Sequence, residues 1–526
     1  MRFAIVDRLA SHTPLSAYEV DAVKNAIRKE LVVRIDEVVA NENDSTETEL
    51  SAALARYGVV PMFGFPTRVR NLWEKEVTSR SGMQKYVLSD RALDLAIRSF
   101  APAAEVVKDG LVHTVAGFAA YLPKGNTAKA VDPLGQPKTV GRCGSCGRTE
   151  LTSVFTCSAC GEPQEHIDVY EPRGFRTNYK PRPYDDDQEV LSSVSTPALV
   201  LTGTPTSTTD ALNMTLDLFS QSRLVSINDN FGRGYTFREQ PDKTVLAETA
   251  PPGTSPLKTI GEVRVTDALL VTPKRLEVGT GSIGLYDIPS GRASYTSFAE
   301  ALRRAAQVYL DLDPVELTAG VMPLQLPVFG STGVQEGQQV GASVFLADTA
   351  ENGAGYAVEL GRRETFTAML KGALTELRVA WESSDHAQTC DTSCPDCLRS
   401  YNNSRRHPLL DWRLALDMLE IVAGEPLTVS RSLPLYGEWM DASAAALKNS
   451  SRVEIAGVPA ITREDRCVLL CHPLWRREST YFTQTQRSAV ANAERQFRKV
   501  STHDIREFRQ NPISIWKDLQ RSDTFE

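Results

Sequence analysis

The chain has 526 residues, of which 41% are hydrophobic, and a formal net charge of −8 at pH 7. This length and composition indicate a globular protein with about two to four domains. The acidic balance argues against a surface that binds nucleic acid everywhere, although a local basic groove remains compatible with it. No apolar run approaches the roughly 20 residues of a membrane span, and the first apolar stretch is too short for a secretory signal. We therefore expect a cytoplasmic protein without membrane contact, in which clustered cysteines bind metal rather than form disulfides.

The first part of the chain is predicted to be helical. An amphipathic helix is expected to open at Pro14 and Ser16, to break at 41–46 and to be followed by a second helix. A loop rich in Gly, Pro and aromatic residues then runs through 57–70 and ends in arginines. Taken alone, this loop is more typical of a core plug between helices than of a binding element.

The middle of the chain is predicted to be mainly β-structure. Short strands and turns surround the first cysteine group. Residues 190–290 are rich in Val, Thr, Ser and Leu with frequent turns, which predicts an antiparallel β domain with a tight turn at 226–234.

Helices return after this region. Ser297-Phe-Ala-Glu300 has the pattern of a capping box ahead of a helix to Leu310. Apolar residues at helical spacing predict a helix over 364–382, and a further helix is expected from Pro408 and Asp411.

The last hundred residues alternate strands, at 453–461 and 467–471, with a helix at 483–497. The expected fold class is therefore multidomain α+β. Its predicted units are a helical N-terminal segment (1–105), a zinc-ribbon region (106–188), a β-rich domain (189–290), a helical zinc-binding domain (291–425) and a small α/β module (426–526).

The first cysteine group is Cys143-x2-Cys146-x10-Cys157-x2-Cys160, and a glycine follows each pair. Two such knuckles bring four thiolates within tetrahedral reach, and the glycines let the backbone turn so that amides point at the sulfurs. An iron–sulfur cluster also uses four thiolates, but paired x2 knuckles favour zinc. Because four protein ligands leave no open position, we expect the metal to hold the fold rather than to catalyse a reaction.

The second group, Cys390-x3-Cys394-x2-Cys397, supplies three thiolates, so a closed site needs a fourth ligand. His407 is the favoured candidate because it lies just before a predicted helix start, from which its ring could turn back toward the cysteines. His386, four residues before Cys390, is the alternative. Such a metal would fasten the end of one long helix to the start of the next. We thus predict two zinc ions in the chain.

Other chemical motifs are scarce. Cys467 and Cys471 lie on one face of a predicted strand without further ligands nearby, which favours buried thiols. The sequence contains no G-x-x-x-x-G-K-[ST] loop for ATP phosphates and no G-x-S-x-G or H-E-x-x-H motif. The chain is therefore not expected to be an ATP-driven motor by itself. An acidic nuclease site stays open, because its carboxylates can be widely spaced in sequence.

The surroundings of the second cysteine group resemble a known family. The segment 348–356, the long helix, the three cysteines, Tyr401-Asn402 and Leu409-Leu410-Asp411 together are similar to the MrfA-like zinc-binding domain. That domain forms the C-terminal part of bacterial superfamily 2 DNA helicases and also occurs in separate subunits, such as DrmB of the DISARM anti-phage system. In the family pattern a fourth cysteine falls six residues after the third, where this chain has Asn403.

The upstream half adds to the resemblance. Residues 61–70, 94–97, 105–109 and the cysteine ribbon are similar to the segment that follows the motor in large helicases of this kind. The resemblance implies that the chain corresponds to the post-motor half of such a helicase and that a superfamily 2 motor acts in trans.

The leading hypothesis is a non-catalytic, zinc-containing accessory subunit of a DNA helicase or translocase in anti-phage defence, which binds DNA and docks the motor. The alternatives are a nuclease with Glu454, Asp465 and His472 in the C-terminal module, a subunit of a DNA-repair helicase, and a protein-binding scaffold. Positive tracks give salt-dependent, sequence-tolerant DNA binding, although scattered solvated cations are as common. The candidate DNA-contacting residues are Arg68, Arg70, Arg399, Arg405, Arg406, Arg495, Arg498 and Lys499.

Overall fold

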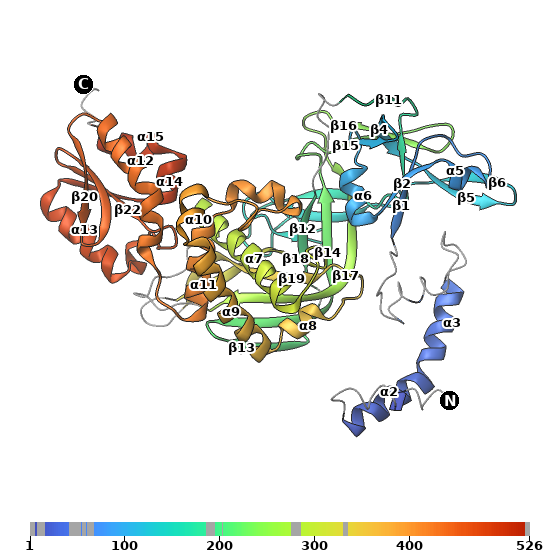
Figure 1. Ribbon diagram of the computed structural model, residues 1–526, viewed down its shortest axis with the longest axis horizontal. Coiled ribbons are helices and arrows are strands. Elements are labelled where there is room, and N and C mark those ends of the chain that lie inside the picture. Colours follow the sequence, from blue (N-terminus) through green and yellow to red (C-terminus); the bar gives the residue numbers. More distant parts are fainter. Residues whose placement is uncertain are drawn as a thin grey trace.

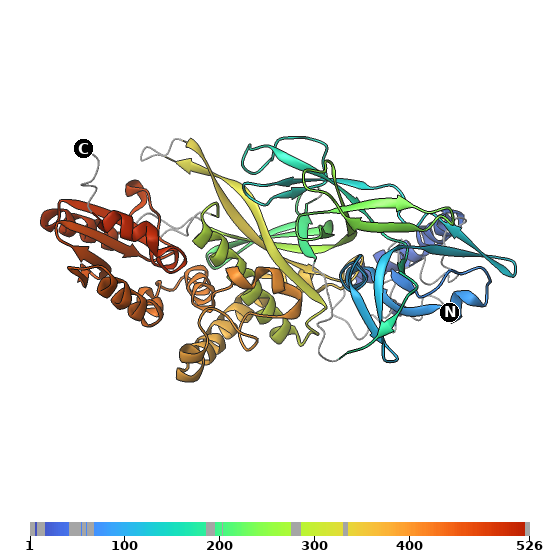
Figure 2. The same cartoon turned by 90° about the horizontal axis from the view of Figure 1, so that it is seen from above.

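The computed structural model describes residues 6–7, 16–41, 54, 59, 68–185, 195–201, 203–274, 286–329 and 335–520. The fold is mixed α/β. The molecule is elongated: an eight-stranded sheet lies at one end, a nine-stranded sheet with its helices lies in the middle, and a four-stranded module lies at the other end (Figures 1 and 2).

Two helices lie near the N-terminus, α2 (Ala17–Lys29) and α3 (Leu31–Asn41). Ser16 caps α2 with a capping box, because its side chain accepts from Glu19 N while the Glu19 carboxylate accepts from Ser16 N. No residue of α2 is buried, and both helices lie apart from the sheets (Figure 1). The helix predicted beyond position 46 and most of the loop at 57–70 lie outside the described residues.

The eight-stranded sheet has the order β15-β16-β4-β10-β1-β2, with β3 and β11 paired to β4. Its core contains Phe118 and Phe175 from the strands and Phe100 from the end of helix α6, and the rings meet at centroid distances of 5.6–5.7 Å. The elements of this end are β1 (Val69–Trp73), α5 (Gly82–Lys85), β2 (Val87–Ala92), α6 (Leu93–Ser99), β3 (Glu105–Lys108), β4 (Leu111–Phe118), β5 (Ala120–Lys124), β6 (Thr127–Val131), β10 (Phe175–Thr177), β11 (Arg182–Pro183), β15 (Tyr235–Glu239) and β16 (Val245–Thr249).

The nine-stranded sheet has the order β12-β14-β17-β9-β7-β8, and β13, β18 and β19 extend it. Side chains alternate between its faces: Leu269 and Val271 of β17 face the helices, whereas Ala268 and Leu270 pack on the opposite face. The strands are β7 (Lys138–Cys143), β8 (Thr149–Glu150), β9 (Gln164–Tyr170), β12 (Thr196–Val200), β13 (Ser207–Ala211), β14 (Met214–Asn228), β17 (Leu257–Pro273), β18 (Leu317–Phe329) and β19 (Gln335–Asp348).

This sheet crosses the predicted boundaries at 188/189 and 290/291, so the layout in consecutive domains is not confirmed. Strand β17 pairs with β9 of the cysteine ribbon in parallel and with β14 and β19 antiparallel. The antiparallel pairing of β14 with β17 fits the expected β structure of this region, and the predicted turn follows β14, with positive φ at Asn230, Phe231, Gly232 and Gly234.

A layer of helices covers one face of the nine-stranded sheet (Figure 2). The predicted helix at 364–382 is confirmed as α9, which buries the expected apolar face from Phe366 to Trp381. The helix predicted after Pro408 is α11, and Asp411 caps it by accepting from Arg413 N. The elements of the layer are α7 (Pro289–Leu310), α8 (Tyr356–Leu360), α9 (Arg363–Trp381), α10 (Ser384–Thr389), the 3-10 helix η2 (Tyr401–Leu409) and α11 (Trp412–Ala423).

The expected capping box at Ser297–Glu300 is wrong. Helix α7 already begins at Pro289, where proline suits the first turn, so both residues lie in its interior. They serve tertiary contacts instead: Ser297 Oγ accepts from Asp411 N at 2.8 Å, and the Glu300 carboxylate accepts from Arg406 at 3.1 Å.

The C-terminal module is a four-stranded sheet, β20-β21-β22-β23, with helices on both faces. Val468 and Leu470 of β22 face α12, α14 and α15, while Cys467 and Cys471 face α13 and are buried, as predicted. The elements are η3 (Val429–Ser432), α12 (Leu433–Ala446), β20 (Ser450–Ile455), β21 (Val458–Arg463), β22 (Arg466–Cys471), η4 (Ser479–Tyr481), α13 (Gln484–Gln496), β23 (Lys499–Asp504), α14 (Ile505–Gln510) and α15 (Pro512–Leu519).

The single strand expected at 453–461 is in fact a hairpin. Ala456 and Gly457, with φ of 51° and 80°, turn the chain between β20 and β21. A two-residue turn of this kind needs positive φ at both positions. The dipeptide Ala456-Gly457 lacks the Asn or Asp that usually marks such a turn, so the sequence pattern did not predict a hairpin here.

Candidate metal centres

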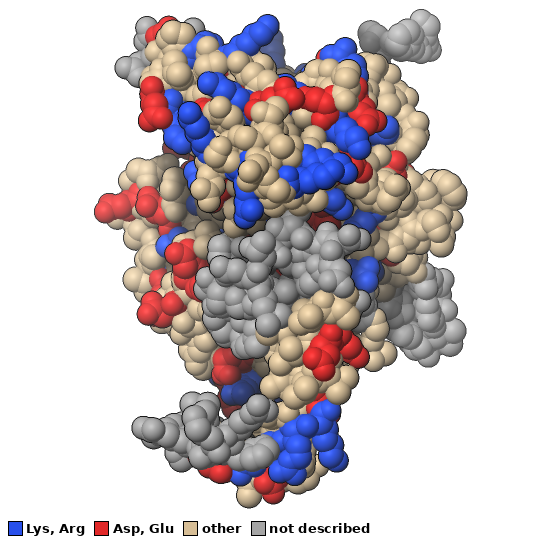
Figure 3. Space-filling model, turned by 90° about the vertical axis from the view of Figure 1, so that its right-hand side faces the viewer, with Lys and Arg blue, Asp and Glu red and all other residues tan. Residues whose placement is uncertain are grey.

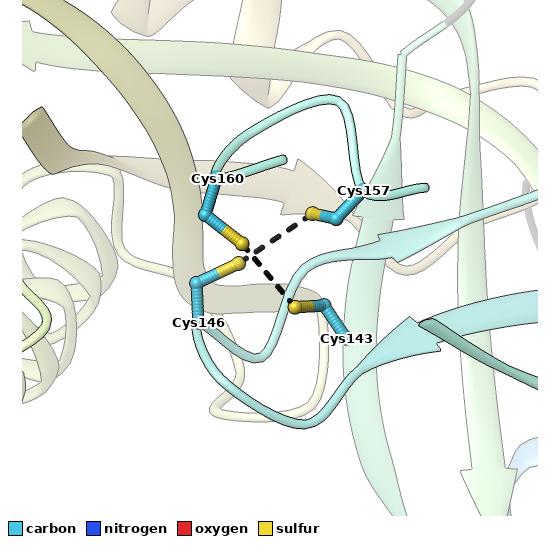
Figure 4. A group of neighbouring side chains, drawn as sticks. All are labelled: Cys143, Cys146, Cys157 and Cys160. Atoms are coloured by element: carbon cyan, nitrogen blue, oxygen red, sulfur yellow. Dashed lines mark hydrogen bonds between the residues drawn. The ribbon is translucent and has the colours of Figure 1, made fainter. Parts of the chain in front are cut away.

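The four cysteines of the first group come together at the end of the ribbon. Cys143 ends β7, Cys146 follows in the turn, and Cys157 and Cys160 lie in the turn before β9. Their side chains point toward one another (Figure 4), with Sγ–Sγ distances of 3.4 Å between Cys143 and Cys160 and 3.7 Å between Cys146 and Cys157. All four sulfurs lie within 4.8 Å of one another and could hold one metal ion.

The two knuckles of this cluster share one backbone geometry. In the first, Gly147 N donates to Cys143 O at 3.0 Å, and in the second Gly161 N donates to Cys157 O at 3.0 Å. Both glycines have positive φ, 80° and 75°, a conformation that side chains disfavour. The tight turn expected at the glycines is therefore seen in the structure, and their N–H groups donate to carbonyl oxygens of the knuckle.

Burial disfavours the thiolate form of Cys143, Cys146 and Cys160, so ionisation of the cluster requires a compensating cation. Burial raises the pKa of the Cys160 thiol to about 11, and it also raises the pKa of Cys146. Burial opposes ionisation of Cys143 as well, but N–H groups of Cys146 and Ser145 help to lower its pKa to about 7. A divalent metal would stabilise all four thiolates at once, which buried thiols cannot achieve alone.

In the second group the structure brings His386, not His407, to the three cysteines. His386 Nε2 lies 3.5 Å from Cys394 Sγ, and Cys397 Sγ lies 3.7–3.8 Å from the sulfurs of Cys394 and Cys390. The ligand atoms of all four residues lie within 4.8 Å of one another. His386, the alternative candidate for the fourth ligand, therefore replaces the favoured candidate His407.

The surroundings of His386 suit a metal ligand. Its Nδ1 lies 2.9 Å from the carbonyl oxygen of Trp381 at the end of α9, so an Nδ1–H donor leaves the Nε2 lone pair for a metal. The ring also contacts Trp412 edge to face at 5.3 Å. Ser383 caps the short helix α10, which places His386 one turn before Cys390. This i, i+4 spacing on a helix is the signal in the sequence that could have identified the ligand.

His407 has a different role. Its Nε2 lies 3.1 Å from Ser400 O and 3.0 Å from Asn403 Oδ1 within η2. Asn403, at the position where the family pattern has its fourth cysteine, is buried and closes the same loop by donating to Leu398 O and accepting from Ser400 N. The prediction of His407 failed because η2 begins between Cys397 and the histidine and turns the ring into its own loop.

The second cluster joins three elements. His386 lies within α10 and the three cysteines follow that helix. Trp412 at the start of α11 donates from Nε1 to Cys390 O at 3.2 Å and from its backbone N to Thr392 O at 2.9 Å. Asp391, beside Cys390, forms an ion pair with Arg509 of the C-terminal module. A metal here would hold the helical layer and the module together, which is a structural role.

The predicted DNA-contacting residues do not form one track. Four of them are engaged in internal contacts: Arg68 pairs with Glu351, Arg70 donates to Pro172 O, Arg405 pairs with Asp229 and Arg406 pairs with Glu300. Arg405 and Arg406 are therefore each held by a buried carboxylate rather than extended into solvent. The exposed candidates are Arg399, Arg495, Arg498 and Lys499.

The face that carries the eight-stranded sheet also lacks a uniform positive surface. Lys and Arg gather in the upper half of Figure 3 but are interspersed with Asp and Glu. The fields of neighbouring opposite charges partly cancel, which weakens the long-range attraction of this face for a polyanion such as DNA.

The residues considered for a nuclease site lie apart. His472 is buried, and its Nε2 lies 3.0 Å from Asp417 of α11. Asp465 is exposed at the opposite end of the six-residue strand β22, about 20 Å away at 3.3 Å per residue, and Glu454 is exposed on β20. Across the described ranges, the groups of three or more potential metal ligands are the two cysteine clusters. Also within these ranges, no helix has the length and apolarity needed to cross a bilayer.

Comparison with known proteins agrees with the second cluster. The sequence model of the MrfA Zn-binding domain family matches residues 298–398. The chain thus contains a domain of this family, and the resemblance found in its sequence is confirmed. The matched range includes His386 and the three cysteines and ends before His407.

A curated relative is the Druantia protein DruE of Escherichia coli (strain UMEA 4076-1), which is 25% identical over 445 residues. The alignment covers 74% of this chain but 23% of DruE, so the chain spans about a quarter of that protein's length. A crystal structure of the DUF1998 helicase MrfA bound to DNA aligns with a TM-score of 0.32 and 10% identity, over 67% of this chain and 34% of that chain.

Proposed function

We propose that this chain is a zinc-containing, non-catalytic component of an ATP-dependent superfamily 2 DNA helicase or translocase in bacterial anti-phage defence. The observation that carries the proposal is an MrfA-type domain with a complete four-ligand cluster. The similarity to DruE, a Druantia protein, supports the defence setting and does not point to DISARM. The motor lies outside these 526 residues, since their sequence has no P-loop.

Both clusters bind Zn²⁺ in this proposal. Thiolate and imidazole donors at tetrahedral reach select zinc over the oxygen-seeking Mg²⁺ and Ca²⁺. Because the four protein donors fill each coordination sphere, the ions fix the ribbon and the joint beneath α11 and leave no position for a reacting water. The zinc ions therefore stabilise the surface that meets DNA and the motor.

The exposed cations of the C-terminal module supply part of the DNA contact. Arg495, Arg498 and Lys499 lie at the end of α13 and the start of β23, and all three are exposed. Each phosphate that a cation neutralises releases counterions, so the affinity falls as salt rises.

The test uses the purified full chain with fluorescently labelled single- and double-stranded DNA over a range of salt concentrations. We expect salt-dependent binding and no ATP hydrolysis by the chain alone. The triple variant R495Q/R498Q/K499Q should reduce the slope of log K against log salt by about two to three. A control triple of exposed residues at the other end, R233Q/R238Q/K243Q, removes the same charge and should leave the slope unchanged.

ATP turnover that persists through purification would refute the accessory role, as would binding to neither DNA nor a superfamily 2 motor. Cleavage of DNA with added divalent metal would instead support the nuclease alternative. A superfamily 2 motor, if one is encoded beside this chain, should hydrolyse ATP faster when the chain is added.

A further inference from the structure

A cavity of about 400 Å³ lies where α6, the nine-stranded sheet, α7 and η2 meet. None of the eight residues of the metal clusters lines it, so it is separate from both centres. Its volume is within the range of small-molecule sites, about 300–1,000 Å³. Charged and apolar side chains both line the cavity, and together they indicate which class of ligand would bind there.

Five arginines and four carboxylates line the cavity. They form two connected groups of ion pairs. In one group Arg264 joins Asp94 (3.8 Å) to Glu262 (2.6 Å), and Arg68 joins Glu262 (3.6 Å) to Glu351 (2.8 Å). In the other group Glu300 accepts from Arg303 at 3.0 Å and from Arg406 at 3.1 Å. The carboxylates hold these guanidiniums in place before any ligand arrives.

Several guanidinium donors remain for a ligand. Arg98 donates to Asp94 O at 3.3 Å and to Asn402 Oδ1 at 2.9 Å, and it has no carboxylate partner in the part of the chain that is described. Arg303 and Arg406 each bind Glu300 and one neutral oxygen. A guanidinium carries five N–H donors, so each of these side chains keeps donors beyond those used. Fixed guanidiniums of this kind suit a phosphate, which accepts two bonds from one arginine.

The cavity also has an apolar wall with exposed members. Leu95 of α6 is 39% exposed and Val315, before β18, is 57% exposed. Pro197 and Pro314 also line this wall. An apolar ring packed on these exposed side chains would remove apolar surface from water, which is favourable in proportion to the area covered.

We propose that this cavity binds a nucleotide, with its phosphate at Arg98, Arg303 and Arg406 and its base against Leu95 and Val315. The same chemistry can come from a free nucleotide or from one unit of a single DNA strand. If the nucleotide is one unit of a DNA strand, the inference rests on the proposed function, because it assigns a defined pocket to the proposed DNA binding.

The test measures binding of thymidine 5′-monophosphate and deoxyguanosine 5′-monophosphate to the full chain by calorimetry. Val315→Trp fills the mouth of the cavity and should abolish binding. Its control, Val308→Trp, alters a residue that is 66% exposed on α7 and outside the cavity lining, and it should bind as the wild type does. Arg98→Gln should weaken binding about tenfold, the loss expected for one charge-assisted contact. Arg91→Gln, an exposed arginine outside the lining, is its control. Val315 and Val308 are both largely exposed in the wild type. The unfolding temperatures of the variants Val315→Trp and Val308→Trp should therefore match that of the wild type.

An oligothymidylate of about 12 nucleotides distinguishes the two sources. If the ligand is a strand unit, the oligonucleotide should displace the mononucleotide, and Val315→Trp should weaken both to a similar degree. If the ligand is a free nucleotide, oligonucleotide binding should be the same in Val315→Trp and wild type while mononucleotide binding is lost.

Absence of saturable binding by either mononucleotide, or binding that Val315→Trp leaves unchanged, would overturn the inference. DNA binding that persists under these conditions and depends on the cations of the C-terminal module would leave the proposed function intact. The two failures are thus distinguishable.

Discussion

Replacing His386 with alanine removes the one nitrogen donor of the second metal cluster and leaves three thiolates. The variant also loses the ring contact with Trp412 and leaves the Trp381 carbonyl without its partner on His386. Neither of these losses involves the other cluster, so we expect a selective effect on one metal ion.

The magnitude follows from the number of donors. Zinc binding to a structural four-ligand site contributes about 10–16 kcal/mol, so one ligand of four accounts for about 2.5–4 kcal/mol. A loss of this size weakens zinc affinity about 10²- to 10³-fold. His386→Ala should therefore retain one tightly bound zinc and release the other to a moderate chelator. Because the knuckle joins α10, α11 and the C-terminal module, proteolysis between the module and the helical layer should become faster.

The assay is metal content by atomic spectroscopy after dialysis against a chelator of graded strength. His386→Cys restores a fourth soft donor and should recover the second zinc. His407→Ala loses its contacts with Ser400 and Asn403, which costs about 1–2 kcal/mol of stability, but it should keep two zinc ions. Two zinc ions with unchanged affinity in His386→Ala, or loss of one in His407→Ala, would refute the assignment.

Cys143→Ser should lose the zinc of the ribbon and unfold it locally, whereas Cys467→Ser, a buried thiol outside both clusters, should keep both ions; a fully metallated, soluble Cys143→Ser protein would contradict this. Chelation of the wild type at pH 7 should lower its thermal unfolding temperature, and zinc, but not magnesium, should restore it. Arg431→Leu should destabilise the junction of α11 with the C-terminal module by about 3–5 kcal/mol in urea, because it removes the buried cation that Asp417 and Glu420 share and leaves Glu420 with Arg378 and Asp417 with His472. Burial opposes ionisation of Glu420, but Arg431 holds the pKa of this carboxyl below its usual value. The stability that the pair contributes is therefore fully present above the unfolded-state pKa of Glu420. It is lost as pH falls through the lower, folded-state pKa. This acid-side loss should become smaller in Arg431→Leu, in which Arg378 still lowers the pKa of Glu420, and an unchanged pH profile would count against the account.

The amino-acid sequence by itself determined the features that depend on neighbouring residues. The x2 spacing and the following glycines predicted both cysteine knuckles, because a metal-binding turn closes within a few residues. The apolar face from Phe366 to Trp381 predicted α9, because helical periodicity is also local. The motifs around the second cluster were specific enough to identify the MrfA-type domain.

The tertiary structure alone decided where distant partners meet. Arg405 and Asp229 lie 176 residues apart in sequence, and Arg406 and Glu300 lie 106 apart, so no local pattern showed that these arginines were already paired. The choice between His386 and His407 depended on the direction in which α10 and η2 present their rings. Strand β17 joined the ribbon to the β region for the same reason: strand pairing is set by burial and backbone hydrogen bonds between remote segments, which spacing in the sequence does not encode.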